Sequence, residues 1–131
     1  MFRVEWNLVG ESMYRLRVQT HFNAAHRIVG YRGKWSRVHG HTWTVEVIVV
    51  GEKLDEIGML ADFRVLKEKL NEVVEKLDHT FLNDFEEIGN PTCENIARYI
   101  YERLKDSLEN VRLEKVRVWE GEDNWGEYYE A

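Results

Sequence analysis

Two runs of alternating residues constrain the fold of this 131-residue chain more than any other feature. In residues 12–24, apolar side chains alternate with polar or charged ones, and residues 41–50 form a second such run, rich in β-branched residues. Successive side chains of a β-strand point to opposite faces, so a period of two predicts half-buried strands. We therefore expect a sheet with one face packed against a core.

Two later segments carry apolar residues at helical spacing. One begins after Asp62 and the other after Thr92, and both of these side chains are suited to cap a helix. The apolar stripes are Phe63, Leu66, Leu70, Val73, Val74 and Leu77 in the first helix, and Ile96, Ile100, Leu104 and Leu108 in the second. Further strands are predicted at about 113–120 and 124–130. The order ββααββ predicts an α+β fold, an antiparallel sheet with two helices on one face, whose open edges favour oligomerisation.

Length and composition favour one domain over residues 1–131. No apolar run approaches membrane-spanning length, and Met1–Glu5 shows no signal peptide. The single cysteine, Cys93, excludes an internal disulfide framework and is typical of a reducing compartment. We therefore expect a cytoplasmic protein that has no contact with a membrane.

Three histidines, His26, His39 and His41, fall within sixteen residues. Because His39 and His41 lie two apart and lead into a strand, both imidazoles point to one face. His26 ends the first alternating run and can supply a third nitrogen. Three protein nitrogens with an open fourth position are the arrangement of a catalytic zinc. The alternative is a chance pair of histidines on the surface of a strand.

The charge of the chain reverses sign around these histidines. The formal net charge is -6, yet no Asp or Glu occurs from Arg15 through Val45. The cations of this stretch are Arg15, Arg17, Arg27, Arg32, Lys34 and Arg37. Cations beside a metal favour an anionic small molecule, a phosphate above all. The acidic chain carries no recognised nucleic-acid-binding motif, so we expect no nucleic-acid partner.

Two acidic residues are further candidates. Asp78 precedes His79, and such a pair can work as a general acid/base, although taken alone it is better explained as a plain helix end. Glu120 shares the strand parity of Val116 and Val118, which we expect to face the core. A carboxylate on an inward face needs a donor such as the edge of a heterocycle. Alternatively, the strand ends at residue 119 and Glu120 is solvated.

Six short motifs occur in order along the chain. They are Phe22-x-Ala24-Ala25-His26, His39-Gly40-His41, Gly58-x-x-x-Asp62-Phe63, Leu77-Asp78-His79-x-x-Leu82-Asn83, Pro91-Thr92-x-Glu94-Asn95, and a Val-x-Val-x-Glu strand ending at Glu120. Together they resemble the 6-pyruvoyl-tetrahydropterin synthase family, which includes 6-carboxytetrahydropterin synthase. The resemblance runs from about Arg15 to Glu120. It implies the tunnelling fold, in which ββααββ subunits form homotrimers around a barrel, usually stacked as hexamers.

The resemblance also implies a set of site residues. Zinc would be held by His26, His39 and His41. The substrate would be a pterin such as 7,8-dihydroneopterin triphosphate, with its ring anchored by Glu120 and the Thr92 region. Asp78 and His79 would handle protons at a site shared between subunits.

One position departs from the family pattern. The family places a catalytic cysteine four residues before the first histidine of His-Gly-His, and here that residue is Trp35. An indole has no useful base at neutral pH, so we expect at most weak activity of the standard synthase type. Retro-aldol cleavage or isomerisation of the pterin side chain would require fewer protein bases. The alternative is a non-catalytic pterin- or zinc-binding relative.

A cupin-like metal protein is another interpretation. Gly33, His39, His41 and Glu46 have the spacing of the first cupin motif. On a straight strand, however, Glu46 points away from the two histidines. The two amphipathic helices and the lack of a second histidine motif also disfavour a jelly roll.

Overall fold

The computed structural model describes residues 13–131, in which both alternating runs form long strands. Strand β1 spans Tyr14–His26 and strand β2 spans His39–Gly51. They pair antiparallel from Tyr14 opposite Gly51 to His26 opposite His39. The full-length pairing brings His26 and His39 together at one end of the ribbon. Residues 1–12, with the predicted start of the first strand and the Met1–Glu5 segment, lie outside the described residues.

The sheet has five strands in the order β3-β1-β2-β4-β5. Strands β4 (Arg112–Glu120) and β5 (Asn124–Tyr128) extend it antiparallel from β2, as predicted. Strand β3 (Thr80–Phe81) pairs parallel with β1 and makes the sheet mixed instead of purely antiparallel. Two residues are too few to show an alternation, so the sequence pattern did not predict β3.

A β-bulge in β4 settles which way Glu120 points. The pairing with β2 skips Glu114, because Ile48 lies opposite Lys115 and the next residue of β2 lies opposite Leu113. One extra residue reverses the alternation, so Leu113 (3% exposed) and Val118 (0%) both face the core. Glu120 lies two residues beyond Val118 and therefore points to the face that carries the core.

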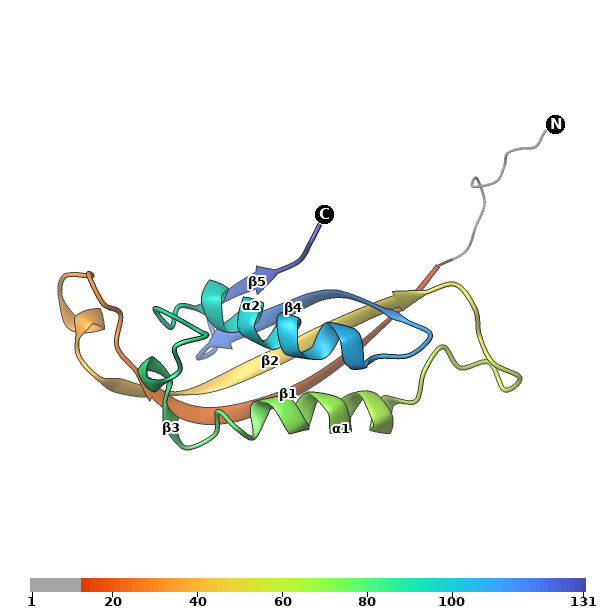
Figure 1. Cartoon of the computed structure of the whole chain (residues 1–131), viewed down its shortest axis with the longest axis horizontal. Coiled ribbons are helices and arrows are strands. Elements are labelled where there is room, and N and C mark those ends of the chain that lie inside the picture. Colours follow the sequence, from red (N-terminus) through yellow and green to blue (C-terminus); the bar gives the residue numbers. More distant parts are fainter. Residues whose placement is uncertain (1–12) are drawn as a thin grey trace.

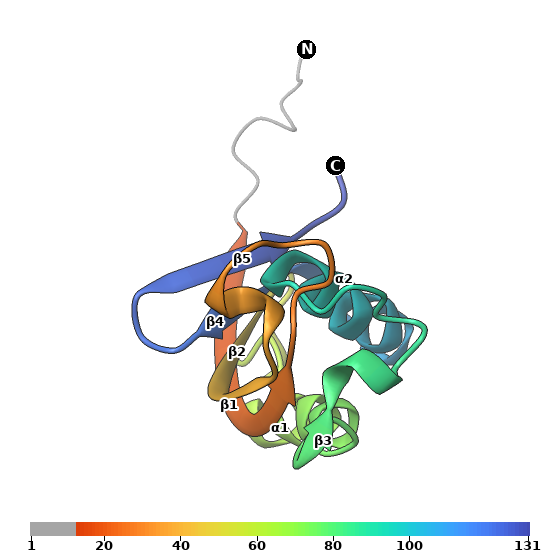
Figure 2. The same ribbon diagram turned by 90° about the vertical axis from the view of Figure 1, so that its left-hand side faces the viewer.

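Two helices cover that face (Figures 1 and 2). Helix α1 spans Phe63–Val74 and helix α2 spans Cys93–Leu104. The predicted caps are present, because Asp62 accepts from the Arg64 N–H and Thr92 accepts from the Asn95 N–H. Short 3₁₀ turns occur at Lys34–Ser36, Leu82–Asp84 and Lys105–Ser107. Within the described residues, no helix is both long and apolar enough to cross a membrane.

The core lies between the sheet and the two helices. Its fully buried members come from both layers and include Val45, Val47, Leu70, Leu77, Ile96, Ile100, Leu104 and Val116. Trp43 is also completely buried, and its indole N–H donates to the carbonyl of Ala24 at 3.1 Å. This bond ties the large side chain on β2 to β1 directly beneath the histidines.

Leu70 provides a test of this packing. Leu70→Ala removes a fully buried side chain from α1, so we expect the free energy of unfolding to fall by about 2–5 kcal/mol. Val65→Ala, on the exposed side of the same helix, should change it by less than about 1 kcal/mol. Denaturant unfolding of both variants measures the difference, and equal losses would contradict the packing of α1 on the sheet.

Candidate metal centre and adjoining cavity

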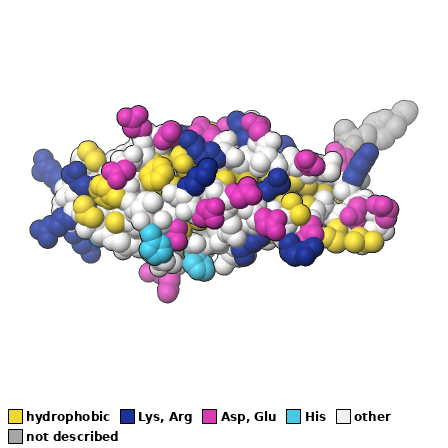
Figure 3. Space-filling view, turned by 60° about the horizontal axis from the view of Figure 1, so that its bottom comes forward, with side chains coloured by type: hydrophobic (Ala, Val, Ile, Leu, Met, Phe, Trp, Pro, Cys, Tyr) yellow, Lys and Arg dark blue, Asp and Glu magenta, His cyan; other side chains and the backbone are white. Residues whose placement is uncertain are grey.

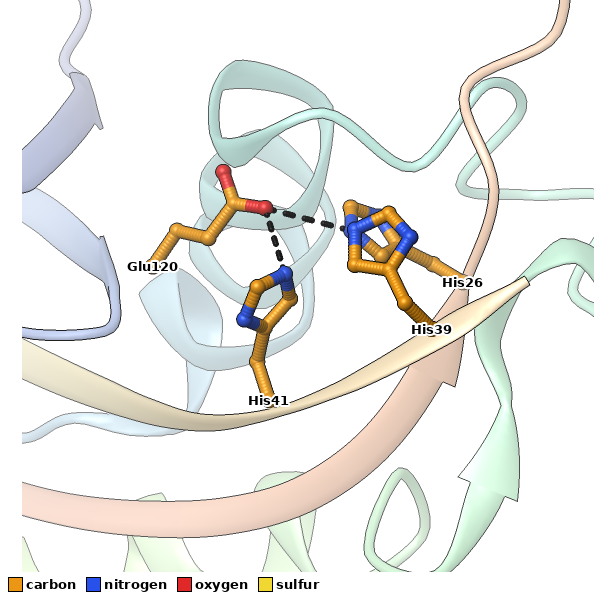
Figure 4. Close-up of side chains that lie close together, drawn as sticks. All are labelled: His26, His39, His41 and Glu120. Carbon is orange, nitrogen blue, oxygen red and sulfur yellow. Dashed lines mark hydrogen bonds and ion pairs between the residues drawn. The ribbon is translucent and has the colours of Figure 1, made fainter. Parts of the chain in front are cut away.

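Three imidazoles converge at one end of the sheet, on the face that carries the helices (Figure 4). His26 is the last residue of β1, and His39 and His41 lie at the start of β2. Their ligand atoms and a carboxylate oxygen of Glu120 all lie within 4.8 Å of one another. His26 is only 1% exposed. The strand register thus gathers the three predicted ligands in one place.

Backbone carbonyls fix the orientation of two of these rings. His26 Nδ1 lies 2.8 Å from the carbonyl oxygen of Pro91, and His39 Nδ1 lies 2.7 Å from that of Arg37. A carbonyl can only accept, so both Nδ1 atoms carry the hydrogen and donate it. In the neutral rings, both Nε2 atoms are then bare acceptors. Such an outer hydrogen bond is typical of histidines that bind a metal.

The two bare nitrogens face each other. His26 Nε2 and His39 Nε2 are 3.1 Å apart, and two lone pairs at that distance repel unless a cation lies against them. Tetrahedral zinc holds two imidazole nitrogens roughly 3.3 Å apart. The spacing therefore fits a shared metal ion.

Glu120 and His41 complete the cluster. Glu120 Oε2 lies 2.8 Å from His41 Nε2 and 3.2 Å from His26 Nε2. His41 Nε2 and Glu120 Oε2 are both buried, and within residues 13–131 neither makes a hydrogen bond of acceptable angle, although they lie close to each other. A cation shared by the two groups would relieve this arrangement. Burial also lowers the pKa of His26 and of His41. A lowered pKa favours the neutral imidazole, which is the form that binds metal.

A cavity of about 320 Å³ adjoins the cluster at Glu120. Its lining residues are Ile28, Tyr31, Trp35, Thr92, Cys93, Glu94 and Glu120. The predicted substrate-binding residues Thr92 and Glu120 therefore share one cavity. A larger cavity of about 900 Å³ lies at the opposite end of the sheet, around Gly51 and Leu60. The only cluster of potential metal ligands among the described residues lies beside the smaller cavity, which is therefore the better candidate site.

Trp35 covers the histidines from the loop between β1 and β2. Its ring centroid lies 5.1 Å from that of His39 and 6.2 Å from that of His41. The sequence indicated only that a thiol is missing at this position. It did not predict that the indole lies against the cluster, because a loop has no period that would place its side chains.

Asp78 and His79 do not reach this cluster within one chain. Helix α1 ends at Val74, so the pair lies in the following turn and not at the helix end that was predicted. Asp78 Oδ2 and His79 Nδ1 are 2.9 Å apart, and the His79 side chain is 79% exposed. The Asn23 N–H donates to Asp78 and lowers the pKa of its carboxyl. The pair is thus anchored to β1 and presented to the exterior.

The Lys and Arg residues between positions 15 and 45, where no Asp or Glu occurs, divide into two groups. Arg15 and Arg17 form ion pairs with Glu114 and Glu46 on the face of the sheet that the helices leave open. The others lie in the loop beyond β1, and Lys and Arg side chains gather at that end of the molecule (Figure 3). Only the loop cations therefore belong to the surroundings of the candidate site.

Glu46 also decides against the cupin interpretation. Its carboxylate contacts Arg17 Nε at 2.7 Å and accepts from the indole N–H of Trp119. These partners lie on the open face of the sheet, away from His39 and His41, so the carboxylate that a cupin motif requires is not part of the cluster.

Comparison with known proteins agrees with this geometry. The family model for 6-pyruvoyl tetrahydropterin synthase matches residues 15–131. A putative 6-carboxy-5,6,7,8-tetrahydropterin synthase from Archaeoglobus fulgidus is 49% identical over 110 residues, which cover 84% of this chain and 90% of the relative. A dihydroneopterin monophosphate aldolase from Pyrococcus furiosus is 39% identical over 110 residues, which cover 83% of this chain and 91% of the relative.

A solved structure confirms the fold. The structure of Caenorhabditis elegans 6-pyruvoyl tetrahydropterin synthase matches with a TM-score of 0.80 at 29% identity, and the match covers 100% of each chain. The fold and the family predicted from the motifs are therefore both confirmed. The chain belongs to the 6-pyruvoyl tetrahydropterin synthase family of pterin lyases.

Proposed function

We propose that this protein is a zinc-dependent lyase that cleaves the side chain of a phosphorylated 7,8-dihydroneopterin by a retro-aldol reaction. The observation that carries the proposal is the convergence of three imidazoles beside a cavity in which Trp35 replaces the catalytic thiol. The cluster supports metal chemistry, and the indole does not support the proton abstraction of the standard synthase.

In this proposal, His26, His39 and His41 hold the zinc ion. The Nδ1 hydrogen bonds of His26 and His39 and the lowered pKa of His26 and His41 fit a cation at this position. Bound zinc would supply Lewis acidity toward hydroxyl and carbonyl oxygens of the substrate.

Glu120 and Thr92 are proposed to bind the pterin ring. Both line the cavity, and one oxygen of Glu120 points away from the histidines (Figure 4). A carboxylate can accept two hydrogen bonds from the exocyclic amine and a ring N–H of a pterin. The loop cations beyond β1 favour a substrate that carries phosphate.

The proposed reaction breaks one carbon–carbon bond. A base removes the proton of the 2′-hydroxyl, the C1′–C2′ bond breaks, and its electrons move into the C6–N5 imine of the dihydropterin. C1′ then takes up a proton. A monophosphate substrate gives 6-hydroxymethyl-7,8-dihydropterin and glycolaldehyde phosphate, with no oxidant or reductant required. The aldolase named among the relatives supports this choice.

His79, oriented by Asp78, is the proposed proton carrier. Because the pair faces outward from its own chain, it would serve the metal centre of another copy. This requires a homo-oligomer, for which we propose the trimer, or a hexamer of two trimers, that the family resemblance implies. The edge strands β3 and β5 each have a side that pairs with no other described strand, and such edges favour assembly.

The zinc assignment predicts the metal content of three variants. His39→Ala should lose nearly all bound zinc, because it removes one of the three nitrogen ligands. His21→Ala should keep it, because His21 is exposed on the open face of the sheet. Glu120→Gln should also keep it if the carboxylate binds pterin. Metal analysis after dialysis distinguishes these outcomes, and zinc loss in Glu120→Gln would instead make Glu120 a fourth ligand.

The products of turnover test the proposed reaction. Mass spectrometry after incubation with the monophosphate and the triphosphate of 7,8-dihydroneopterin should show 6-hydroxymethyl-7,8-dihydropterin. His79→Ala should lower the rate by at least about 100-fold through loss of general acid/base catalysis. Efficient formation of a 6-pyruvoyl or 6-carboxy product would instead support the synthase named among the relatives. Pterin binding without any product would indicate a non-catalytic relative.

The remaining thiol is not expected to replace the missing one. Burial raises the pKa of Cys93 to about 12, so the thiol stays protonated at neutral pH and cannot act as a base. At pH 8, iodoacetamide should modify the folded protein far more slowly than the unfolded chain, because the thiolate fraction is roughly 1000-fold smaller. Rapid alkylation of the folded protein at pH 8, or loss of activity in Cys93→Ser, would contradict this reading.

A further inference from the structure

Trp35 forms a wall of the cavity on the side of the histidine cluster. It lines the cavity together with Glu120, and its ring also lies against His39 and His41. We propose that Trp35 is the stacking surface for the planar ring of the ligand. This role rests on the proposed function, because it assigns the aromatic face of the same pterin site.

A planar ligand can be bound both at its edge and at its face. Glu120 offers a carboxylate, which recognises the hydrogen-bond donors on the edge of a heterocycle. A flat, fused ring also needs a partner for its face, and an indole offers the largest aromatic surface of any side chain. Trp35 and Glu120 line the same cavity of about 320 Å³. One cavity therefore provides an edge contact and a face contact.

The wall is held in place by the backbone of its own loop. The Ile28 N–H donates to the Trp35 carbonyl at 2.9 Å. Two asparagine side chains form hydrogen bonds with the backbone of the residues on either side of Ile28. Asn83 accepts from the Arg27 N–H at 2.9 Å and donates to the Arg27 carbonyl at 3.0 Å.

Asn90 makes the same pair of bonds two residues further along. It accepts from the Val29 N–H at 2.9 Å and donates to the Val29 carbonyl at 3.0 Å. The two amide side chains thus imitate a paired strand along residues 27–29. A wall that is fixed before the ligand arrives loses less conformational freedom on binding. These hydrogen bonds hold the backbone at Trp35, and the contacts of its ring with His39 and His41 limit where the indole can lie.

Trp35 also has a simpler explanation, which is packing against the histidines. An apolar side chain of similar bulk would then serve as well as an aromatic one. Stacking requires a π face, so Phe should replace Trp35 and Leu should not. The comparison of these two substitutions separates the roles.

The experiment measures binding of neopterin, the oxidised and unreactive analogue, by calorimetry on the full chain with zinc added. Trp35→Ala and Trp35→Leu should weaken binding by about 10-fold or more, and Trp35→Phe by less than about threefold. Zinc content and the thermal unfolding midpoint should be the same in all three variants.

Other outcomes overturn the assignment. Wild-type affinity in Trp35→Leu would show that Trp35 contributes bulk alone. Loss of zinc from Trp35→Phe would make the indole a structural part of the metal centre. Failure of the wild-type protein to bind neopterin would contradict the pterin site itself, and with it the stacking role. Wild-type binding that depends on Glu120 but not on Trp35 would leave the proposed function intact and reject only the stacking wall.

Discussion

The approach of two bare imidazole nitrogens is the constraint on which the rest of the site depends. His26 and His39 each use one ring nitrogen to donate to a backbone carbonyl, which leaves the other nitrogens 3.1 Å apart without a hydrogen between them. Bringing two acceptors together under burial costs free energy that a bound metal ion would offset. The carbonyls come from Pro91 and Arg37. The segment before α2 and the loop before β2 therefore both orient the proposed metal ligands.

The register between β1 and β2 brings these two histidines together. His26 lies opposite His39 because β1 and β2 pair without interruption along their length. A slip by one residue would turn His39 and His41 to the open face of the sheet. Two interactions on the helix side of the sheet disfavour such a slip. Trp43 is buried there, and its indole N–H donates a hydrogen bond to the carbonyl of Ala24. The core beneath the histidines thus also fixes the geometry above it.

Hydrophobic periodicity and helix-capping residues predicted the long strands and the starts of both helices. The long strands follow from alternation, and both helix starts follow from Asp62 and Thr92, because these signals depend on neighbours in the sequence. Strand parity likewise predicted that His39 and His41 share a face, whereas the place of His26 beside them depends on the register of β1 with β2. The end of α1 was wrong by several residues, because Leu77 continues the apolar stripe in the turn beyond the helix. Strand β3 and the bulge at Glu114 were missed, since both depend on pairing with distant residues.

Side chains in loops were the least predictable part of the structure. The motifs include Asn83, but the sequence does not show that Asn83 and Asn90 both hydrogen-bond the backbone of residues 27–29. Nor does the substitution of the thiol by Trp35 show where the indole lies. With the ring against His39 and His41, the position that would hold a base instead presents an apolar surface to the cluster. Under the proposed function, such a site would keep its Lewis acid and its ring anchor but lack a base at the substrate side chain, and proton transfer would have to come from outside the cavity. The exposed Asp78–His79 pair suits that role, because a pair anchored to β1 and facing outward can enter the site of a neighbouring copy.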